Sequence, residues 1–216
     1  MNAISVAVLS VALSTSALAN EKAPFNVRDL VVMERVSSPT LSPDGRLVVF
    51  AVRQADVAAN KSKTGLWIEN LMARDAMPPT RFTDESLNVN SPSFSPDGKT
   101  VYFLSAKSGS MQLWAQALDA KTAMQISNFD LDVGSYKILP DGKSIALSFE
   151  VFNDCVDLAC TKKRLDTQAA NKASGVLYDK LFIRHWDTWA DGRRNQLFVA
   201  PLSAEKVGAP VKISRG

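Results

Sequence analysis

The chain has little of what most metal, catalytic and nucleic-acid sites are built from. It has one histidine, His185, and two cysteines, Cys155 and Cys160, so neither a metal site nor a cofactor centre is expected. No Gly-x-Ser-x-Gly motif occurs, and a Ser-His-Asp triad cannot be assembled from the expected motifs. The net charge is only +3, and no dense basic run carries interleaved aromatics, so nucleic-acid binding is not expected.

The N-terminus has the pattern of a leader. Residues 4–13 are apolar, and residues 17–19 read Ala-Leu-Ala, a cleavage signal of small residues. No Lys or Arg precedes the apolar run, so the α-amino group is the only positive charge there. We expect residues 1–19 to be a signal peptide and the mature chain to be periplasmic or secreted, without membrane attachment. A strand or helix buried in the mature fold is the alternative for this run.

A short phrase occurs three times along the chain. Residues 42–46 read Ser-Pro-Asp-Gly-Arg, residues 95–99 read Ser-Pro-Asp-Gly-Lys, and residues 139–143 read Leu-Pro-Asp-Gly-Lys. Proline presets its φ angle and glycine accepts a left-handed one, so each phrase predicts a tight turn. Each phrase leads into a run rich in β-branched and aromatic residues or alternating in polarity, which predicts a strand.

The similarity extends beyond the turns. A second shared strand is predicted at 66–68, 112–115 and 196–199, and a short closing strand at 81–83, 125–127 and 212–214. One unit therefore holds a turn and several short strands, about the content of a four-stranded blade. A period in this range with strand-like flanks indicates a β-propeller.

We therefore predict an all-β fold, a partial β-propeller of about four four-stranded blades with a short N-terminal helix, over residues 20–216. Dividing the length after residue 19 by about 45–50 residues per repeat gives this number of blades. The last predicted strand falls just before the next turn is due. An open arc exposes a strand edge, so we expect the front part of a longer polypeptide or a truncated product. The alternative is a homodimer of two arcs.

Several segments resemble the prolyl oligopeptidase family of serine peptidases, in particular its exported bacterial acylaminoacyl-peptidase and dipeptidyl peptidase V type members. They lie at residues 25–30, 34–45 and 178–189, and the Arg-His-Trp-Asp-Thr-Trp part of the last segment is the most specific. The resemblance implies a propeller that filters or orients peptides beside a C-terminal α/β-hydrolase domain. Because the nucleophile motif is absent, the resemblance implies that this chain holds only the propeller portion of such a peptidase. We therefore expect no peptidase activity from this chain by itself.

The third unit is longer than the others. Its turn starts at Leu139 but its shared strand arrives only at Gln196, whereas the second unit covers the equivalent path between Ser95 and Gln112. About 40 residues, roughly 150–189, are therefore predicted to be inserted. Long excursions from a regular scaffold are often where binding sites lie.

Carboxylates at the start of this insertion are the candidate substrate-binding residues. The resemblance implies recognition of a free α-ammonium group, which a carboxylate binds best. We single out Glu150, Asp154 and Asp157; a solvated acidic loop is the alternative. Trp186 and Trp189 lie three apart, so on one strand they would face opposite sides. We expect one to pack between blades and the other, Trp186 being our candidate, to face the channel or the hydrolase domain.

The cysteines and the histidine have simpler interpretations. Cys155 and Cys160 form an even pair in a chain expected to be exported, which predicts a disulfide that pins a local excursion, with free thiols as the alternative. No nucleophile motif accompanies His185, so we interpret it as a hydrogen-bonded residue in a strand rather than a catalytic base.

The sequence thus predicts a substrate-gating propeller segment of an exported serine peptidase that acts on oligopeptides. Its expected partners are peptide substrates and a C-terminal α/β-hydrolase domain. The alternative is a non-enzymatic periplasmic propeller that binds protein partners, as TolB-like proteins do.

Overall fold

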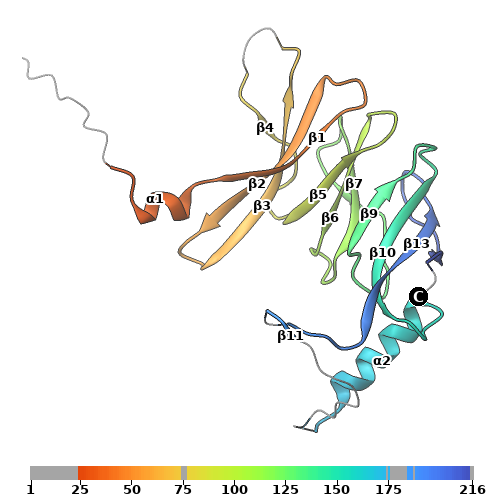
Figure 1. The fold of residues 1–216 in the computed structure, drawn as a ribbon. Helices are drawn as coiled ribbons and strands as arrows, with labels where there is room; N and C mark the ends of the chain where they lie inside the picture. The colour runs from red at the N-terminus through yellow and green to blue at the C-terminus, as the bar shows by residue number, and fades with distance from the viewer. Residues whose placement is uncertain (1–23, 74–76, 174, 176–183, 187, 215–216) are drawn as a thin grey trace, which may run out of the picture.

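Three four-stranded sheets form the body of the molecule (Figure 1). The computed structural model describes residues 24–73, 77–173, 175, 184–186 and 188–214. The predicted signal peptide at 1–19 and the start of the 178–189 segment lie outside these residues. Neighbouring strands in every sheet are antiparallel, and the all-β prediction is confirmed.

Each sheet takes its strands in chain order. The first holds β1 (Arg35–Leu41), β2 (Leu47–Asp56), β3 (Lys61–Asn70) and β4 (Thr80–Arg81). The second holds β5 (Val89–Phe94), β6 (Thr100–Ser105), β7 (Gln112–Ala117) and β8 (Met124–Gln125). The third holds β9 (Ser135–Ile138), β10 (Ser144–Phe152), β13 (Arg193–Pro201) and β14 (Val211–Lys212).

The remaining elements lie outside the sheets. The predicted short N-terminal helix is α1 (Val27–Val32), which leads into β1. The connection from β10 to β13 is the predicted insertion, and it holds the helix α2 (Leu158–Ala170) and a two-stranded hairpin of β11 (Arg184–His185) and β12 (Thr188–Trp189).

The structure corrects the expected number of blades. The described residues form three four-stranded sheets rather than about four. The estimate failed because the β10–β13 connection and the segment before β1 take up length that it had assigned to a fourth blade.

The repeated turns are held by hydrogen bonds between side chains and backbone. In the first turn, Ser42 Oγ donates to Asp44 Oδ1 at 2.5 Å and accepts the Leu47 N–H at 2.9 Å. Asp44 Oδ1 also accepts the Arg46 N–H at 3.1 Å. The second turn repeats this arrangement with the side chains of Ser95 and Asp97. The shared motif therefore encodes a shared bonding pattern.

The third turn reaches the same shape differently, because Leu139 replaces the serine. Here the hydroxyl comes from the far side of the turn: Ser144 Oγ donates to Asp141 Oδ2 at 2.9 Å. Asp141 Oδ1 accepts the N–H groups of Lys143 and Ser144 at 2.9 and 3.0 Å. The weaker match in the sequence is thus compensated within the same turn.

Successive turns also pack against one another. Gly45, Gly98 and Gly142 have φ values of 70°, 71° and 64°, in the left-handed region that favours glycine. A Cβ added to Gly98 would lie 3.3 Å from Pro43 Cδ, and one added to Gly142 would lie 3.7 Å from Pro96 Cγ. Each later glycine therefore sits beside the proline of the preceding turn.

The closing segments are fixed by one further repeated bond. In each sheet, the hydroxyl of the closing segment accepts the N–H of a leucine in the third strand. The pairs are Thr83 with Leu66 at 3.0 Å, Ser127 with Leu113 at 2.8 Å and Ser214 with Leu197 at 2.9 Å. The sequence matches at 81–83, 125–127 and 212–214 thus mark equivalent positions.

Apolar side chains fill the space between neighbouring sheets. One buried cluster joins the first two sheets and includes Val49, Leu66 and Phe103. The other joins the second and third sheets, and in it Phe149 meets Phe129 and Phe198 edge to face, with ring centroids 5.2 Å apart in both pairs. Burying a side chain of this size stabilises the fold by about 1.5–3 kcal/mol.

The two ends of the sheets carry different connections. We call the end with the repeated turns at 42–46, 95–99 and 139–143 the turn end. The opposite end, the insertion end, carries α1, the β2–β3 hairpin and the β10–β13 connection with α2 (Figure 1). No helix in the described part of the chain is both long and apolar enough to cross a membrane.

Candidate functional site

The helix α2 is held against the third sheet by its first turns. Asp157 caps its N-terminus, where the carboxylate accepts the Cys160 N–H at 2.8 Å. Leu158 and Thr161 are buried, and Thr161 Oγ1 accepts the Phe152 N–H at 3.3 Å. Leu165 packs on the core from the same face of the helix, because residues spaced three and four apart share a face.

Two further links tie this helix to the end of β10. A disulfide joins Cys155 to Cys160. The Arg164 guanidinium donates to both carboxylate oxygens of Asp154, at 3.0 and 2.5 Å, and lies 4.4 Å from the centre of the Phe152 ring. The hydrogen bond from Arg164 holds the pKa of the Asp154 carboxyl below its ordinary value.

A pocket of about 580 Å³ lies between α2 and the insertion end of the third sheet. Its walls come from the end of β10, the start of β13, the loop before β9, the β6–β7 connection and the inner face of α2. The lining residues are Ser110, Asp130, Leu131, Asp132, Gly134, Glu150, Lys162, Leu165, Asp166, Ala169, Arg193 and Asn195.

Carboxylates outnumber cations in this pocket, four to two. Lys162 is paired with Asp166 at 2.6 Å on the helix surface. Arg193 lies 3.3 Å from a Glu150 oxygen and is also held by Asp191 at 2.6 Å.

The other two carboxylates carry no ion pair among the residues that the structure describes. Asp132 accepts the Met111 N–H at 2.7 Å. Asp130 has no hydrogen-bond partner within the described ranges. The pocket therefore has a surplus of negative charge and suits a cationic group.

The structure separates the four predicted site residues. Glu150 lies in the pocket wall on β10. Asp154 and Asp157 do not line the pocket, because one pairs with Arg164 and the other caps α2. Trp186 is not among the residues described as lining it either.

Trp186 and Trp189 do not follow the expected alternation along one strand. Trp186 lies in the turn between β11 and β12, with a φ of 57° and 86% of its surface exposed, and Trp189 is 44% exposed. Neither is buried between blades, because the segment turns back on itself at Trp186. His185 is in strand β11, as the sequence predicts.

Sequence reasoning missed Asp130, Lys162 and Arg193 as pocket residues. The side chain of Arg193 is only 27% exposed. The spacing of Lys162 and Asp166, four apart after the capping residue Asp157, was a helix signal that could have placed α2. In the described part of the chain, no group of three or more His, Cys, Asp or Glu side chains could hold a metal ion.

Three sheets in chain order with stacked turns make this molecule an arc of a β-propeller, and known structures bear out that class. No protein-family model matches the chain. An acylaminoacyl peptidase from Pyrococcus horikoshii is 17% identical and gives a TM-score of 0.60 over 87% of this chain and 26% of its own. The β-propeller domain of the Trilobed protease from Pyrococcus furiosus gives 0.50 over 84% of this chain and 44% of its own, at 17% identity.

Similar sequences are found among proteins that are named as peptidases. Dipeptidyl-peptidase 5 from Porphyromonas gingivalis is 31% identical over 183 residues, which are 84% of this chain and 25% of that protein. Dipeptidyl-peptidase 5 from Porphyromonas endodontalis is 27% identical over 82% of this chain. The chain thus spans about a quarter of the length of these relatives. The predicted resemblance to the propeller portion of prolyl oligopeptidase-family peptidases is confirmed.

Proposed function

We propose that this chain is the substrate-gating propeller portion of an exported serine peptidase that acts on oligopeptides, of the dipeptidyl or acylaminoacyl peptidase type. The observation that carries the proposal is the 31% identity to dipeptidyl-peptidase 5 over most of this chain. The nucleophile and its acid and histidine partners then belong to an α/β-hydrolase domain outside these 216 residues. The relatives matched in sequence are named as peptidases, which favours this function over the TolB-like alternative.

In this proposal the pocket beneath α2 binds the amino end of the peptide. A free α-ammonium is a compact cation with three donors, and carboxylates bind it through charge-assisted hydrogen bonds. Glu150 can accept such a bond because Arg193 remains held by Asp191. Asp130 lines the same pocket and offers a second carboxylate.

A binding experiment on the chain tests this role. The probes are the amide of the tripeptide Ala-Ala-Ala with a free amino group and the same amide with an acetylated amino group, compared by titration calorimetry. We expect the free amine to bind about tenfold or more tightly, because acetylation removes the charge that the carboxylates recognise. Glu150→Gln and Asp130→Asn should each remove most of this preference.

Glu205→Gln is the matched control, since Glu205 is exposed in the β13–β14 connection and does not line the pocket. Equal binding of the two probes, or an equal loss with Glu205→Gln, would overturn the assignment of the amino-end pocket.

A second experiment tests the peptidase assignment itself. The product translated through the codons after Gly216 should contain a Gly-x-Ser-x-Gly motif and release dipeptides from a chromogenic dipeptidyl substrate, whereas the present chain should release none. A stop codon directly after Gly216, with no hydrolase in frame, would contradict the assignment. Sedimentation of the chain would then show whether two arcs pair instead.

Export is proposed on the leader pattern alone. N-terminal sequencing of the protein recovered from the periplasm or medium should begin at Asn20, the residue after the predicted cleavage site. Recovery of the intact Met1 terminus from the cytoplasm would contradict it.

A further inference from the structure

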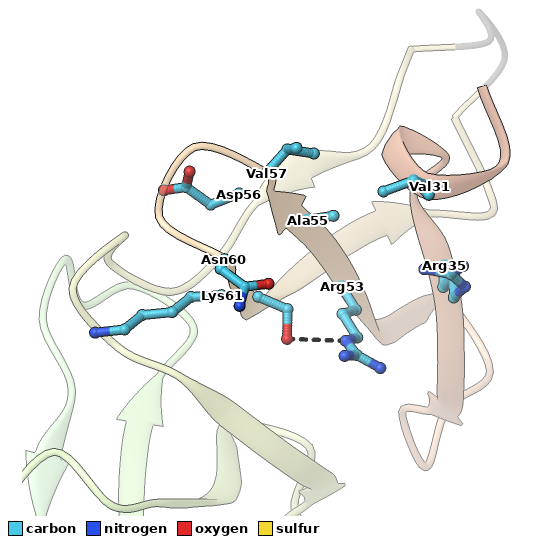
Figure 2. Close-up of a pocket in the computed structure, with 9 residues that line it drawn as sticks. Val31, Arg35, Arg53, Ala55, Asp56, Val57, Asn60 and Lys61 are labelled. Atoms are coloured by element: carbon cyan, nitrogen blue, oxygen red, sulfur yellow. Dashed lines mark hydrogen bonds between the residues drawn. The ribbon is translucent and has the colours of Figure 1, made fainter. Parts of the chain in front are cut away.

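A second pocket, of about 390 Å³, lies at the insertion end of the first sheet, between α1 and the β2–β3 hairpin. Figure 2 shows Val31 and Arg35 on one side of it, Val57 and Asn60 on the other, and Arg53 with Ala55 between them. This pocket shares no lining residue with the pocket beneath α2.

Two arginines that line this pocket occupy opposite positions on neighbouring strands. Arg35 on β1 is directly opposite Arg53 on β2 in the antiparallel register. Side chains at such positions start about 4.5–5.5 Å apart, and like charges there are destabilising. Within the described residues neither arginine forms an ion pair. Two guanidinium groups without an ion pair among the described residues suit a ligand of negative charge.

Each arginine is oriented by one bond that leaves other donors of its guanidinium available. Arg53 Nε donates to Ser62 Oγ at 3.0 Å. Arg35 donates from one terminal nitrogen to the Leu30 carbonyl at 3.3 Å, at the end of α1. A guanidinium has five donors in a planar fork, so both side chains keep N–H groups for a ligand.

The only carboxylate among the described lining residues does not neutralise these arginines. Asp56 points away from Arg53, as does Lys61 (Figure 2), and Asp56 Oδ1 accepts the Ala59 N–H at 3.0 Å. Val31, Ala55 and Val57 supply an apolar wall beside the charged groups. The pocket therefore combines paired guanidinium donors with a surface for an aliphatic group.

We infer that this pocket binds the C-terminal carboxylate of a peptide, with the terminal aliphatic side chain against Val31 and Val57. A carboxylate matches the guanidinium fork in two-point geometry. An inorganic anion would use the arginines but not the apolar wall, and this difference favours a peptide terminus. The inference does not rest on the proposed peptidase function, because it concerns binding to the chain itself.

The test uses N-acetylated Ala-Ala-Ala with a free carboxylate, the corresponding amide and inorganic phosphate, each titrated into the chain. The acetyl group removes the ammonium that the pocket beneath α2 is proposed to bind, so the two sites are probed separately. We expect the free carboxylate to bind about tenfold or more tightly than the amide and than phosphate. Arg53→Gln should abolish this difference, while Glu150→Gln should leave it unchanged.

Two variants show whether binding depends on the guanidinium of Arg53 or only on positive charge. Lys63→Gln is the matched charge control, since Lys63 is on the same strand as Ser62 but on its opposite face. Arg53→Lys keeps the charge without the fork, and should bind the carboxylate more weakly than the wild type but more tightly than Arg53→Gln.

Thermal unfolding without peptide gives the last readout. Arg53→Gln should keep the Tm of the wild type or raise it, because it removes one of two like charges that lie at opposite positions on β1 and β2. A Tm lowered by several degrees would assign Arg53 a structural role and overturn the inference. Equal binding of carboxylate and amide, or phosphate binding as tightly as the peptide, would overturn it as well.

Discussion

The connections at the turn end of the three sheets are nearly identical, whereas those at the insertion end differ from sheet to sheet. At the turn end, three five-residue phrases give three glycines with nearly the same φ, and each aspartate accepts the same backbone N–H two residues on. At the insertion end, the second and third strands are joined by short hairpins in the first two sheets and by α2 with a second hairpin in the third. The pocket beside α1 and the pocket beneath α2 both open at this end. The first has an excess of cationic side chains, and the second has an excess of carboxylates. Uniform connections thus set the geometry of the arc, and variable ones supply its chemistry.

Removing the disulfide should produce the largest effect. It should also show whether α2 can detach without loosening the three sheets. We expect Cys155→Ser with Cys160→Ser to cost about 2 kcal/mol of α2 docking, as estimated for a loop this short. Hydrogen exchange should show faster exchange in α2 and little change in the three sheets. Uniform loss of protection across the sheets would mean that the insertion helps to hold the arc together.

The glycines of the first two turns form a matched pair at the turn end. Gly45→Ala should cost about 1–2 kcal/mol of unfolding free energy, because alanine resists the left-handed conformation. Gly98→Ala has the same backbone conformation but also crowds Pro43 Cδ at 3.3 Å, so we expect a larger loss in urea unfolding. Equal losses in the two variants would show that the turns do not pack tightly on one another.

The turn aspartates should give the smallest effect, seen as a pH dependence. Hydrogen bonds from the Ser42 and Ser95 hydroxyls hold the pKa of Asp44 and Asp97 below the ordinary 3.8, and the Lys143 N–H does the same for Asp141. A pKa lowered in the folded state stabilises the fold above the unfolded value, and this contribution is lost as the pH falls through the folded value.

We therefore expect the Tm of the wild type to fall more steeply below about pH 4 than that of the variant with all three aspartates changed to asparagine. Asp119→Asn, an exposed change outside the three repeated turns, serves as the control. Parallel Tm curves for the triple variant and the wild type would contradict a stabilising role for these carboxylates.

The same contrast explains what could be predicted from the sequence. The turn end was predictable because proline, aspartate and glycine impose local conformations that do not depend on distant contacts. The insertion was located by counting, but α2 was missed because its buried face is short, with only Leu158 and Thr161 buried.

The candidate site was predicted only at Glu150. Asp154 and Asp157 have the right chemistry, but a sequence does not show whether a carboxylate meets a ligand, an arginine or a helix N-terminus. Asp130 and Arg193 meet at the pocket through long-range strand order, which local patterns do not encode. The opposed pair Arg35 and Arg53 likewise depends on the register of β1 against β2.

The stacking of each later glycine on the proline of the turn before it gives the arc a direction. A ribosome releases the first turn before the second and the second before the third, so Pro43 is in place when Gly98 emerges, and Pro96 when Gly142 emerges. Each unit can then use the completed one as a template, and assembly during synthesis proceeds by nearest-neighbour addition from the N-terminus. The nascent chain of this protein should therefore become protease-resistant in steps, one sheet at a time.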